Sequence, residues 1–184
     1  MSKKPTISAR RRIIHTGVFN IEEMDLEFTN GEQRKYQCVV GSDQGAVLAV
    51  PLLDQKTVLL IREYAAGTDR YELAFPKGHI EDGEDMLVAA DREIQEEVGY
   101  GARKLKHIHS FTIAPGYMSH TTHIVLASEL FPQKLPGDEP EEIEVVPWKI
   151  ADMEQLLRCD DFTEARSIAA LFLVRDMLQA DSNV

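Results

Sequence analysis

The sequence predicts an α/β fold in which a mixed β-sheet carries helices on its faces and follows a small N-terminal antiparallel β-sheet. Apolar and polar residues alternate on both sides of Asn30-Gly31 over residues 17–40, which is typical of a hairpin with a two-residue turn. Two nearly continuous apolar runs flank Asp54-Gln55 in residues 46–64, as in strands covered on both faces. Helical spacing follows at 84–98 and 163–179, so strands are interleaved with only a few helices.

The N-terminal segment, residues 1–45, is predicted to form a hairpin or small sheet of its own beside a main domain of residues 46–184. A chain of 184 residues suits one compact domain with a small appended sheet and leaves no room for a second full-size domain. A sheet with unpaired edges is rarely stable alone, which favours packing against a partner subunit. We therefore expect a homodimer.

The elements of the main domain are expected in the following order. A strand at 71–75 leads into a glycine-rich loop and then into the helix at 84–98, where Leu87, Ala90, Ile94 and Val98 share one face and Gly99 is placed to end the helix. Strands are expected at 105–113 and 121–127, and helices at about 149–158 and 163–179. The last helix is apolar almost all round, so it should be well buried.

The charge and the cysteines exclude several classes of protein. A net charge of −11 repels phosphate backbones, so we expect no binding to nucleic acid or to anionic membranes. The tract Arg10–Arg12 is interpreted as a solvated patch, with a binding arm as the alternative. Cys38 and Cys159 have no partner at metal-ligand spacing and form no disulfide framework. Without a signal peptide or membrane span, the simplest inference is a cytoplasmic protein.

The helix at 84–98 also crowds carboxylates beside its apolar face. Glu93, Glu96 and Glu97 lie at i, i+3 and i+4, so their side chains share one side of a regular helix. Like charges at this spacing destabilise a helix, and a cation should compensate for them. Oxygen ligands without histidine or cysteine suit Mg²⁺ or Mn²⁺. The alternative is an acidic helix face exposed to water.

The stretch around this helix resembles the Nudix box, G-x5-E-x7-R-E-U-x-E-E-x-G-U, where U is aliphatic. Gly78, Glu84, Arg92-Glu93-Ile94, Glu96-Glu97 and Gly99 all match, and Tyr100 stands where an aliphatic residue is usual. The resemblance implies an α/β/α sandwich and a metal-dependent hydrolase of nucleoside diphosphates linked to another group. By this resemblance Glu93 and Glu97 are the main metal ligands, Glu96 and the carbonyl group near Gly78 are further ones, and Glu84 braces the loop through Arg92.

The segments on either side of the box are similar to the ADP-ribose pyrophosphatase branch of the family, and most of all to the bacterial ADP compounds hydrolases. They are "LIREYAAGTDRYELAFPKG", "GDEPEEIEVVPW" and "TEARSIAALFLVRDML". This implies hydrolysis of ADP-ribose, NADH or adenine dinucleotides such as diadenosine triphosphate, with release of AMP. The alternatives are a sensor of ADP-ribose or NAD without turnover, an RNA-bound Nudix protein, and a hydrolase of ADP-sugars or coenzyme A. The intact glutamates argue against the sensor, and the net charge argues against RNA.

The flanks supply further candidate residues. Arg62 is a candidate phosphate contact, because a guanidinium group fits phosphate oxygens, and the alternative is an ion pair at a strand end. Glu72 is a candidate for a ribose hydroxyl or for a metal-bound water. By resemblance, the acidic loop supplies Glu139 as general base and Glu141 as a metal ligand on closure. The alternative is a solvated loop formed by these residues together with Asp138, Glu142 and Glu144.

Two tyrosines are candidates for binding the two ends of the substrate. Tyr36, in the second strand of the hairpin, is predicted to stack on adenine across a dimer interface, with a packed core tyrosine as the alternative. Tyr117, in the turn-like stretch "APGYMSH", is a candidate for the opposite end of the pocket.

Overall fold

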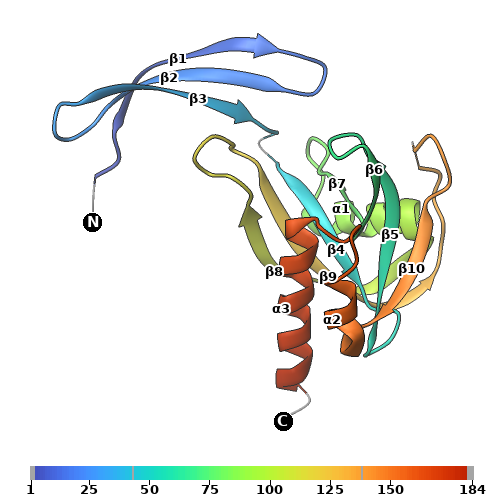
Figure 1. Ribbon diagram of the computed structural model, residues 1–184. Coiled ribbons are helices and arrows are strands. Elements are labelled where there is room, and N and C mark those ends of the chain that lie inside the picture. Colours follow the sequence, from blue (N-terminus) through green and yellow to red (C-terminus); the bar gives the residue numbers. More distant parts are fainter. Residues whose placement is uncertain (1–2, 43, 138, 182–184) are drawn as a thin grey trace. The chain divides into compact units, whose positions relative to one another are not determined.

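The computed structural model describes residues 3–42, 44–137 and 139–181. These residues cluster into two units, described separately below (Figure 1). The N-terminal unit comprises residues 1–45 with residues 112–121, and the main unit comprises residues 46–111 with residues 122–184.

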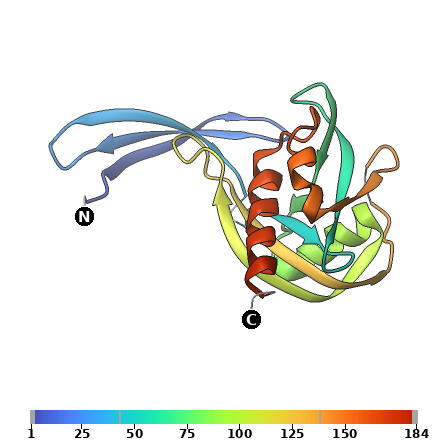
Figure 2. The ribbon, with the colours of Figure 1, turned by 60° about the horizontal axis from the view of Figure 1, so that its bottom comes forward.

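The N-terminal unit is built on a three-stranded antiparallel sheet in the order β1-β2-β3 (Figure 2). Its strands are β1 (Thr6–His15), β2 (Asn20–Glu27) and β3 (Gln33–Val40). The predicted hairpin is therefore confirmed, but the prediction of a two-residue turn is wrong. Residues 28–32 lie between the strands, and Gly31 has a φ of 82°. The Phe28 amide donates to the Glu32 carbonyl at 2.9 Å, which closes the loop around this glycine.

Strand β1 contains the arginine tract that was interpreted as a solvated patch. Arg10 pairs with Glu22 at 3.5 Å, and Arg11 pairs with Glu23 and, at 2.7 Å, with Asp25. All three carboxylates belong to the neighbouring strand β2. The basic residues thus form a strand because opposite charges face them across the sheet, a pairing that β1 alone does not reveal.

The described residues of the main unit form two sheets, and the predicted mixed sheet is one of them. One has the order β7-β4-β9-β8 and the other β10-β5-β6. The strands are β4 (Ala46–Pro51), β5 (Thr57–Ala65), β6 (Arg70–Ala74), β7 (Lys77–His79), β8 (Tyr100–Thr112), β9 (Thr121–Pro132) and β10 (Glu144–Lys149). Strands β4 and β9 are parallel, whereas β4 and β7 are antiparallel, so the first sheet is mixed. β8 begins five residues before its predicted start, and β9 ends five residues after its predicted end.

Alternate residues of the central strands face two separate apolar clusters. Leu48 and Leu60 pack in a cluster with residues of α2 (Met153–Leu156) and α3 (Ala165–Asp181). Val47 and Leu59 pack in a cluster with residues of α1 (Met86–Glu93). In Figure 1, α2 and α3 accordingly lie on the near side of the strands and α1 behind them. Strand β4 is buried on both faces, as predicted, and the predicted α/β/α sandwich is confirmed.

The C-terminal helices differ in detail from their predicted ranges. The helix expected at 149–158 is a 3₁₀ turn, Ile150–Asp152, followed by the short α2. Helix α3 matches the last predicted helix within a few residues, and Leu171 and Val174 are fully buried, whereas Phe172 is 38% exposed. The Arg175 guanidinium lies 4.7 Å from the centre of that ring and covers part of it. Among the described residues, no helix is long and apolar enough to cross a membrane.

Candidate active site

The acidic helix of the main unit is regular only in its first part. Asp85 caps α1, because its carboxylate accepts from the Leu87 amide at 2.8 Å. A π-helical turn, Ile94–Val98, follows directly, and the Gly99 amide donates to the Ile94 carbonyl five residues back at 3.0 Å. Gly99 has a φ of 79° and ends the helix as predicted. Glu96 and Glu97 therefore lie in a widened turn, a feature often found at functional sites, and not on a regular helix face.

Arg92 binds the carboxylates at this end of the helix. Its guanidinium donates to Glu84 at 3.0 and 3.1 Å, to Glu93 at 2.7 Å and to Glu96 at 3.0 Å. A further bond of 3.0 Å reaches the His79 carbonyl in the preceding loop. The expected contact between Glu84 and Arg92 is confirmed. One guanidinium thus fixes both the loop and two of the three helix glutamates.

The backbone of Gly78 comes very close to the helix. A Cβ atom at Gly78 would lie closer than 3.0 Å to all three atoms of the Glu93 carboxylate group. Beside it, the Lys77 amide donates to Glu97 Oε2 at 3.2 Å. Strand β7 therefore presents its backbone to the two carboxylates that were predicted as main metal ligands, and only glycine leaves room for this approach.

Burial changes the protonation of these glutamates. Glu93 and Glu97 are only 7% and 6% exposed. Burial raises the pKa of Glu97 to about 9, against the opposing effect of the Lys77 charge. Burial also raises the pKa of Glu93, although Arg92 acts in the opposite direction. Several carboxylates gathered in one partly buried site form a donor set of hard oxygen ligands, which fits a divalent cation such as Mg²⁺.

These side chains line a groove of about 640 Å³. Glu139 lines the same groove from the acidic loop, and its charge contributes to the raised pKa of Glu93. The lining residues are Glu63, Lys77, Gly78, His79, Glu81, Arg92, Glu93, Glu96, Glu97, Pro136, Gly137, Glu139 and Pro140. The fold thus gathers six predicted site residues in one place, and Arg92 is one of them. Asp138 lies outside the described residues.

Other candidates of the main unit lie outside this groove. The Tyr71 hydroxyl donates to Glu141 at 2.6 Å. Arg62 donates to Glu144 at 2.9 Å and also forms an ion pair with Asp161. The ion pair at a strand end, which was the alternative interpretation of Arg62, is thus present in the structure. Neither Glu141 nor Arg62 is among the residues that line the groove.

Tyr36 and Tyr117 both belong to the N-terminal unit. Tyr36 is 43% exposed on β3, and its ring centre lies 6.4 Å from that of Phe28. Tyr117 is 62% exposed, and its carbonyl accepts from the Val39 amide at 2.8 Å. Neither ring is buried, so the alternative of a packed core tyrosine does not hold for Tyr36.

The sequence interpretation missed a buried link between α3 and Phe75, the residue that follows β6. Ser167 is fully buried, and its hydroxyl accepts from the Phe75 amide at 3.0 Å. The same hydroxyl donates to Glu164 at 2.9 Å, and Arg166 donates to the other oxygen of Glu164 at 2.7 Å. Glu164, Arg166 and Ser167 belong to the sequence "TEARS" (residues 163–167). Polar residues directly before an apolar helix are typical of a helix N-terminus, and this pattern could have indicated the link.

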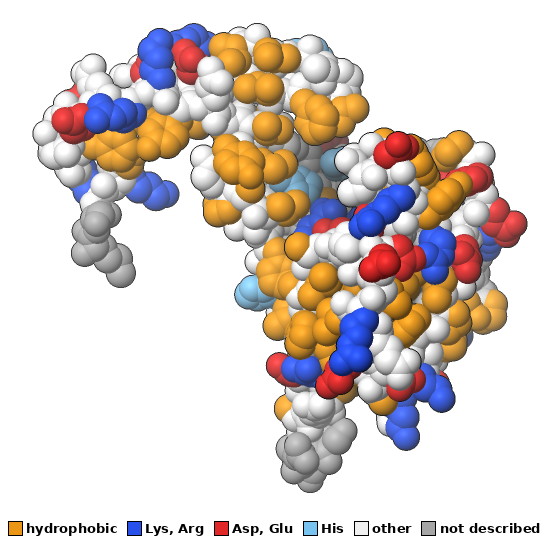
Figure 3. Space-filling model, in the orientation of Figure 1, with side chains coloured by type: hydrophobic (Ala, Val, Ile, Leu, Met, Phe, Trp, Pro, Cys, Tyr) orange, Lys and Arg blue, Asp and Glu red, His pale blue; other side chains and the backbone are white. Residues whose placement is uncertain are grey.

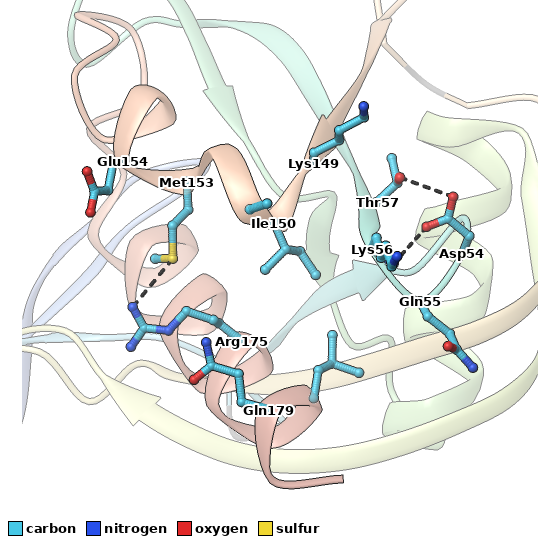
Figure 4. A pocket seen from close by; sticks show the side chains of 12 residues that line it. Asp54, Gln55, Lys56, Thr57, Lys149, Ile150, Met153, Glu154, Arg175 and Gln179 are labelled. Atoms are coloured by element: carbon cyan, nitrogen blue, oxygen red, sulfur yellow. Dashed lines mark hydrogen bonds between the residues drawn. The ribbon is translucent and has the colours of Figure 1, made fainter. Parts of the chain in front are cut away.

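A larger cavity, of about 860 Å³, lies on the main unit and carries none of the predicted site residues (Figure 4). Its walls come from the β4–β5 turn, from the segment between β10 and α2, and from α3. Thr57 and the Lys56 amide bind Asp54 there at 3.1 and 2.7 Å (Figure 4). Among the described residues that line this cavity, only Asp54 and Glu154 carry carboxylates, so it lacks the donor set that distinguishes the groove.

Comparison with known proteins agrees with the geometry. The NUDIX domain model matches residues 43–172, and a model of the NudE-type Nudix hydrolase N-terminal domain matches residues 5–37. The chain is 44% identical to the ADP compounds hydrolase NudE of Escherichia coli, over 99% of this chain and 97% of that protein. It is 29% identical to the ADP-ribose pyrophosphatase of Bacillus subtilis, over 94% of each.

A solved crystal structure of an ADP compounds hydrolase covers the whole of this chain with a TM-score of 0.93 and 44% sequence identity. The match spans 99% of that chain as well. Family models, relatives and fold therefore agree over nearly the full length. The chain belongs to the Nudix hydrolases and, within them, to the NudE type.

Proposed function

We propose that this enzyme hydrolyses the pyrophosphate linkage of ADP-linked compounds, such as ADP-ribose, NADH and diadenosine triphosphate, and releases AMP. One observation carries the proposal: Glu93, Glu96, Glu97 and Glu139 line a single groove beside the backbone of Gly78. The names of its relatives, an ADP compounds hydrolase and an ADP-ribose pyrophosphatase, supply the substrate class.

The divalent metal required by a Nudix hydrolase is proposed to be Mg²⁺ or Mn²⁺. Glu93 and Glu97 would be its main ligands, with Glu96 and the Gly78 carbonyl as further ones. The burial of Glu93 and Glu97 supports this, because buried carboxylates without enough cationic partners are costly. Bound divalent cations would neutralise the pyrophosphate and lower the pKa of a bound water.

The chain's own groups would then orient and deprotonate the attacking water. Glu139 is proposed as the general base, since it lines the groove from a separate segment and can receive a proton without leaving the site. Arg92 is proposed to hold Glu93 and Glu96 in position through its bonds of 2.7 and 3.0 Å. Glu141 is proposed to bind the metal only after its hydrogen bond to Tyr71 is broken. Arg62 is proposed to bind a substrate phosphate only after it releases Glu144 or Asp161.

We further propose that two chains form a homodimer through the N-terminal unit, with Tyr36 stacking on adenine and Tyr117 at the other end of the substrate. Hydrophobic side chains gather on the surface of this unit (Figure 3). Its exposed large apolar residues are Ile7, Ile13, Ile14, Val18, Phe19, Tyr36, Ile113 and Tyr117. Such a concentration of exposed apolar residues favours an interface. A cytoplasmic location is also proposed, and the two free cysteines support it.

The experiment is AMP release from a substrate panel with Mg²⁺ or Mn²⁺, using the wild type, Glu97→Gln and the control Glu154→Gln. The panel contains ADP-ribose, NADH, diadenosine triphosphate, ADP-glucose and coenzyme A. We expect turnover of the first three and a loss of more than about 100-fold in Glu97→Gln, because a metal ligand is removed. Glu154 is exposed in the other cavity, so its variant should keep wild-type activity.

The same panel separates the alternatives. Binding of ADP-ribose without turnover in the wild type would indicate a sensor and contradict the proposal. Turnover of ADP-glucose or coenzyme A alone would agree with pyrophosphate hydrolysis but contradict the proposed substrates. Light scattering of the same samples tests the homodimer, which a single-chain mass would contradict.

A further inference from the structure

The larger cavity of the main unit, of about 860 Å³, is lined by three segments that are bonded to one another. They are the β4–β5 turn, the end of β10 with the start of α2, and the last turns of α3. The Ile150 amide donates to the Lys56 carbonyl at 2.8 Å. Arg175 donates to the Met153 sulfur at 3.5 Å, as Figure 4 shows. The walls are therefore joined before any ligand binds, and the volume lies in the range of small-molecule sites.

One side of this cavity is apolar and suits an aromatic ring. Ile150, Met153 and Leu178 belong to the apolar cluster between the strands and α3 or pack against it. The Arg175 guanidinium lies beside the Met153 sulfur on the same side (Figure 4). Thioether sulfur and guanidinium groups both bind favourably to aromatic rings. This side of the cavity therefore favours a flat aromatic group over an aliphatic chain.

The charge of the cavity is opposite to that of the chain. Its cations are Lys56, Lys149 and Arg175, and its carboxylates are Asp54 and Glu154, which leaves an excess of one positive charge. The chain as a whole carries a net charge of −11. A local positive excess on such a protein favours an anionic ligand.

The two lysines are the groups available to that anion. Lys149 pairs with Thr57 across β10 and β5, and Lys56 directly precedes Thr57, so both lysines begin at one end of this strand pair. Arg175 is bound to Asp176 at 2.7 Å, whereas neither lysine forms an ion pair with another described residue. Lysine ammonium groups bind phosphate as point charges. A phosphate group is therefore the anion that fits this end of the cavity.

Two side-chain amides complete the lining. Gln55 of the β4–β5 turn and Gln179 of α3 both line the cavity. A primary amide offers donors and an acceptor, which is the combination that pairs with the edge of adenine. Phosphate, aromatic ring and hydrogen-bonding edge are the three parts of a nucleotide that a protein can recognise.

We propose that this cavity is a second nucleotide site, which binds AMP with its phosphate on Lys56 and Lys149 and its base beside Met153 and Arg175. The cavity and the groove of Glu93 and Glu97 share no lining residue. A nucleotide bound in the cavity thus leaves the groove free for substrate. The choice of AMP rests on the proposed function, which releases it, whereas the chemistry of the cavity does not.

The test measures binding of AMP by calorimetry with EDTA in place of Mg²⁺. Without divalent cations the carboxylates of the groove repel a phosphate, so the measurement reports a site that needs no metal. Adenosine and inorganic phosphate are the comparison ligands, because each carries one part of AMP. Lys149→Gln removes a proposed phosphate contact. Lys104→Gln is the matched control, since Lys104 is also an exposed lysine of the main unit but pairs with Glu129 on β9.

In the wild type we expect one AMP per chain, bound at least about tenfold more tightly than adenosine or phosphate. Lys149→Gln should weaken AMP binding about tenfold, because a hydrogen bond between two charged groups is lost, and Lys104→Gln should retain it. Absence of AMP binding in EDTA, or equal affinities of the two variants, would overturn the proposal. Equal affinity of the wild type for AMP and phosphate would also overturn it, because the base would then make no contact.

A second measurement locates the ligand without a substitution. Acetic anhydride labels exposed lysines, and mass spectrometry reports the extent of labelling at each position. Lys56, Lys149 and Lys104 are all exposed, so all three should be labelled in the free protein. AMP should reduce the labelling of Lys56 and Lys149 and leave Lys104 unchanged. Bound AMP that protects neither Lys56 nor Lys149 would lie elsewhere and would overturn the proposal.

Neither measurement needs turnover, so both are independent of the AMP-release assay. Metal-free binding of AMP by a wild type that hydrolyses no compound of the substrate panel would contradict the proposed function but not the second site. Turnover without metal-free binding of AMP would contradict the second site alone.

Discussion

Replacing Gly78 by alanine should separate activity from stability. The new Cβ atom would lie well inside 3.0 Å of the whole Glu93 carboxylate group, and that group must retreat by about 1 Å or more. The backbone at Gly78 has no positive φ, so alanine adds no backbone strain. The substitution therefore acts mainly by displacing the Glu93 side chain.

The two effects differ in size. A displaced carboxylate in an unfavourable rotamer lowers the free energy of unfolding by about 0.5–1.5 kcal/mol. Alanine also restricts the unfolded chain more than glycine does, which raises the free energy of unfolding by about 0.4–1 kcal/mol. The free energy of unfolding should thus change by less than about 1 kcal/mol. Displacing a reacting group or a ligand by about 1 Å can lower the rate by about 100-fold, equivalent to about 2.7 kcal/mol in the activation free energy.

The assay combines urea unfolding with AMP release from ADP-ribose at several Mg²⁺ concentrations. Gly17→Ala is the control, because a Cβ atom there would meet nothing within 4 Å. Activity of Gly78→Ala within about threefold of the wild type would refute the reasoning, since it would show that the close approach of Gly78 to Glu93 does not serve the chemistry. A loss of activity that merely follows unfolding would refute it as well.

Two further predictions concern Ser167 of α3 and its hydrogen-bond partners, Phe75 and Glu164. Ser167→Ala leaves the buried Phe75 amide without its acceptor and should lower the free energy of unfolding by about 1–3 kcal/mol in urea titrations. The control Ser8→Ala removes an exposed bond and should cost less than about 0.5 kcal/mol. For Glu164, burial raises the pKa, but hydrogen bonds from Arg166 and Ser167 outweigh it and lower the pKa below 4.5. The stability due to this charge is therefore complete above pH 4.5 and is lost as the pH falls through the folded pKa, so the gap between the wild type and Glu164→Gln should narrow on acidification; a constant gap from pH 7 to pH 3 would contradict this.

Local patterns in the sequence were sufficient for much of the fold. The apolar runs of β4 and β5, the spacing of Leu87, Ala90 and Ile94, and the glycine that ends the helix depend on neighbours within a few residues. The acidic helix was also recognised locally, because all its carboxylates lie within one motif.

The π-helical turn in that helix was not predicted. In a regular α-helix the Gly99 amide would donate to the Gln95 carbonyl, whereas in the structure it donates to the Ile94 carbonyl. Both acceptors are backbone carbonyl groups, which every residue type carries. The sequence therefore does not distinguish the two bonds, and the widened turn around Glu96 and Glu97 becomes visible only in the structure.

Features that depend on distant residues could not be predicted. Strand β1 is polar and basic, and it is stabilised by carboxylates of β2 that the pattern of β1 does not contain. Arg62 pairs with Asp161, 99 positions away, and Glu72 is bound by Thr163, 91 positions away. No short pattern reports such pairs, because their partners are chosen by the packing of α3 and the segment before it against the strands.

The charge of the groove indicates how it must work. Among the described residues that line it, six carboxylates face Arg92 and Lys77, which leaves an excess of four negative charges if all are ionised. Burial raises the pKa of Glu97 to about 9, so this excess falls to three while no cation is bound. A pyrophosphate carries negative charge of its own and would be repelled from such a surface. One divalent cation cannot offset the groove and the substrate together, so we expect at least two to be bound before the substrate can settle beside Glu139.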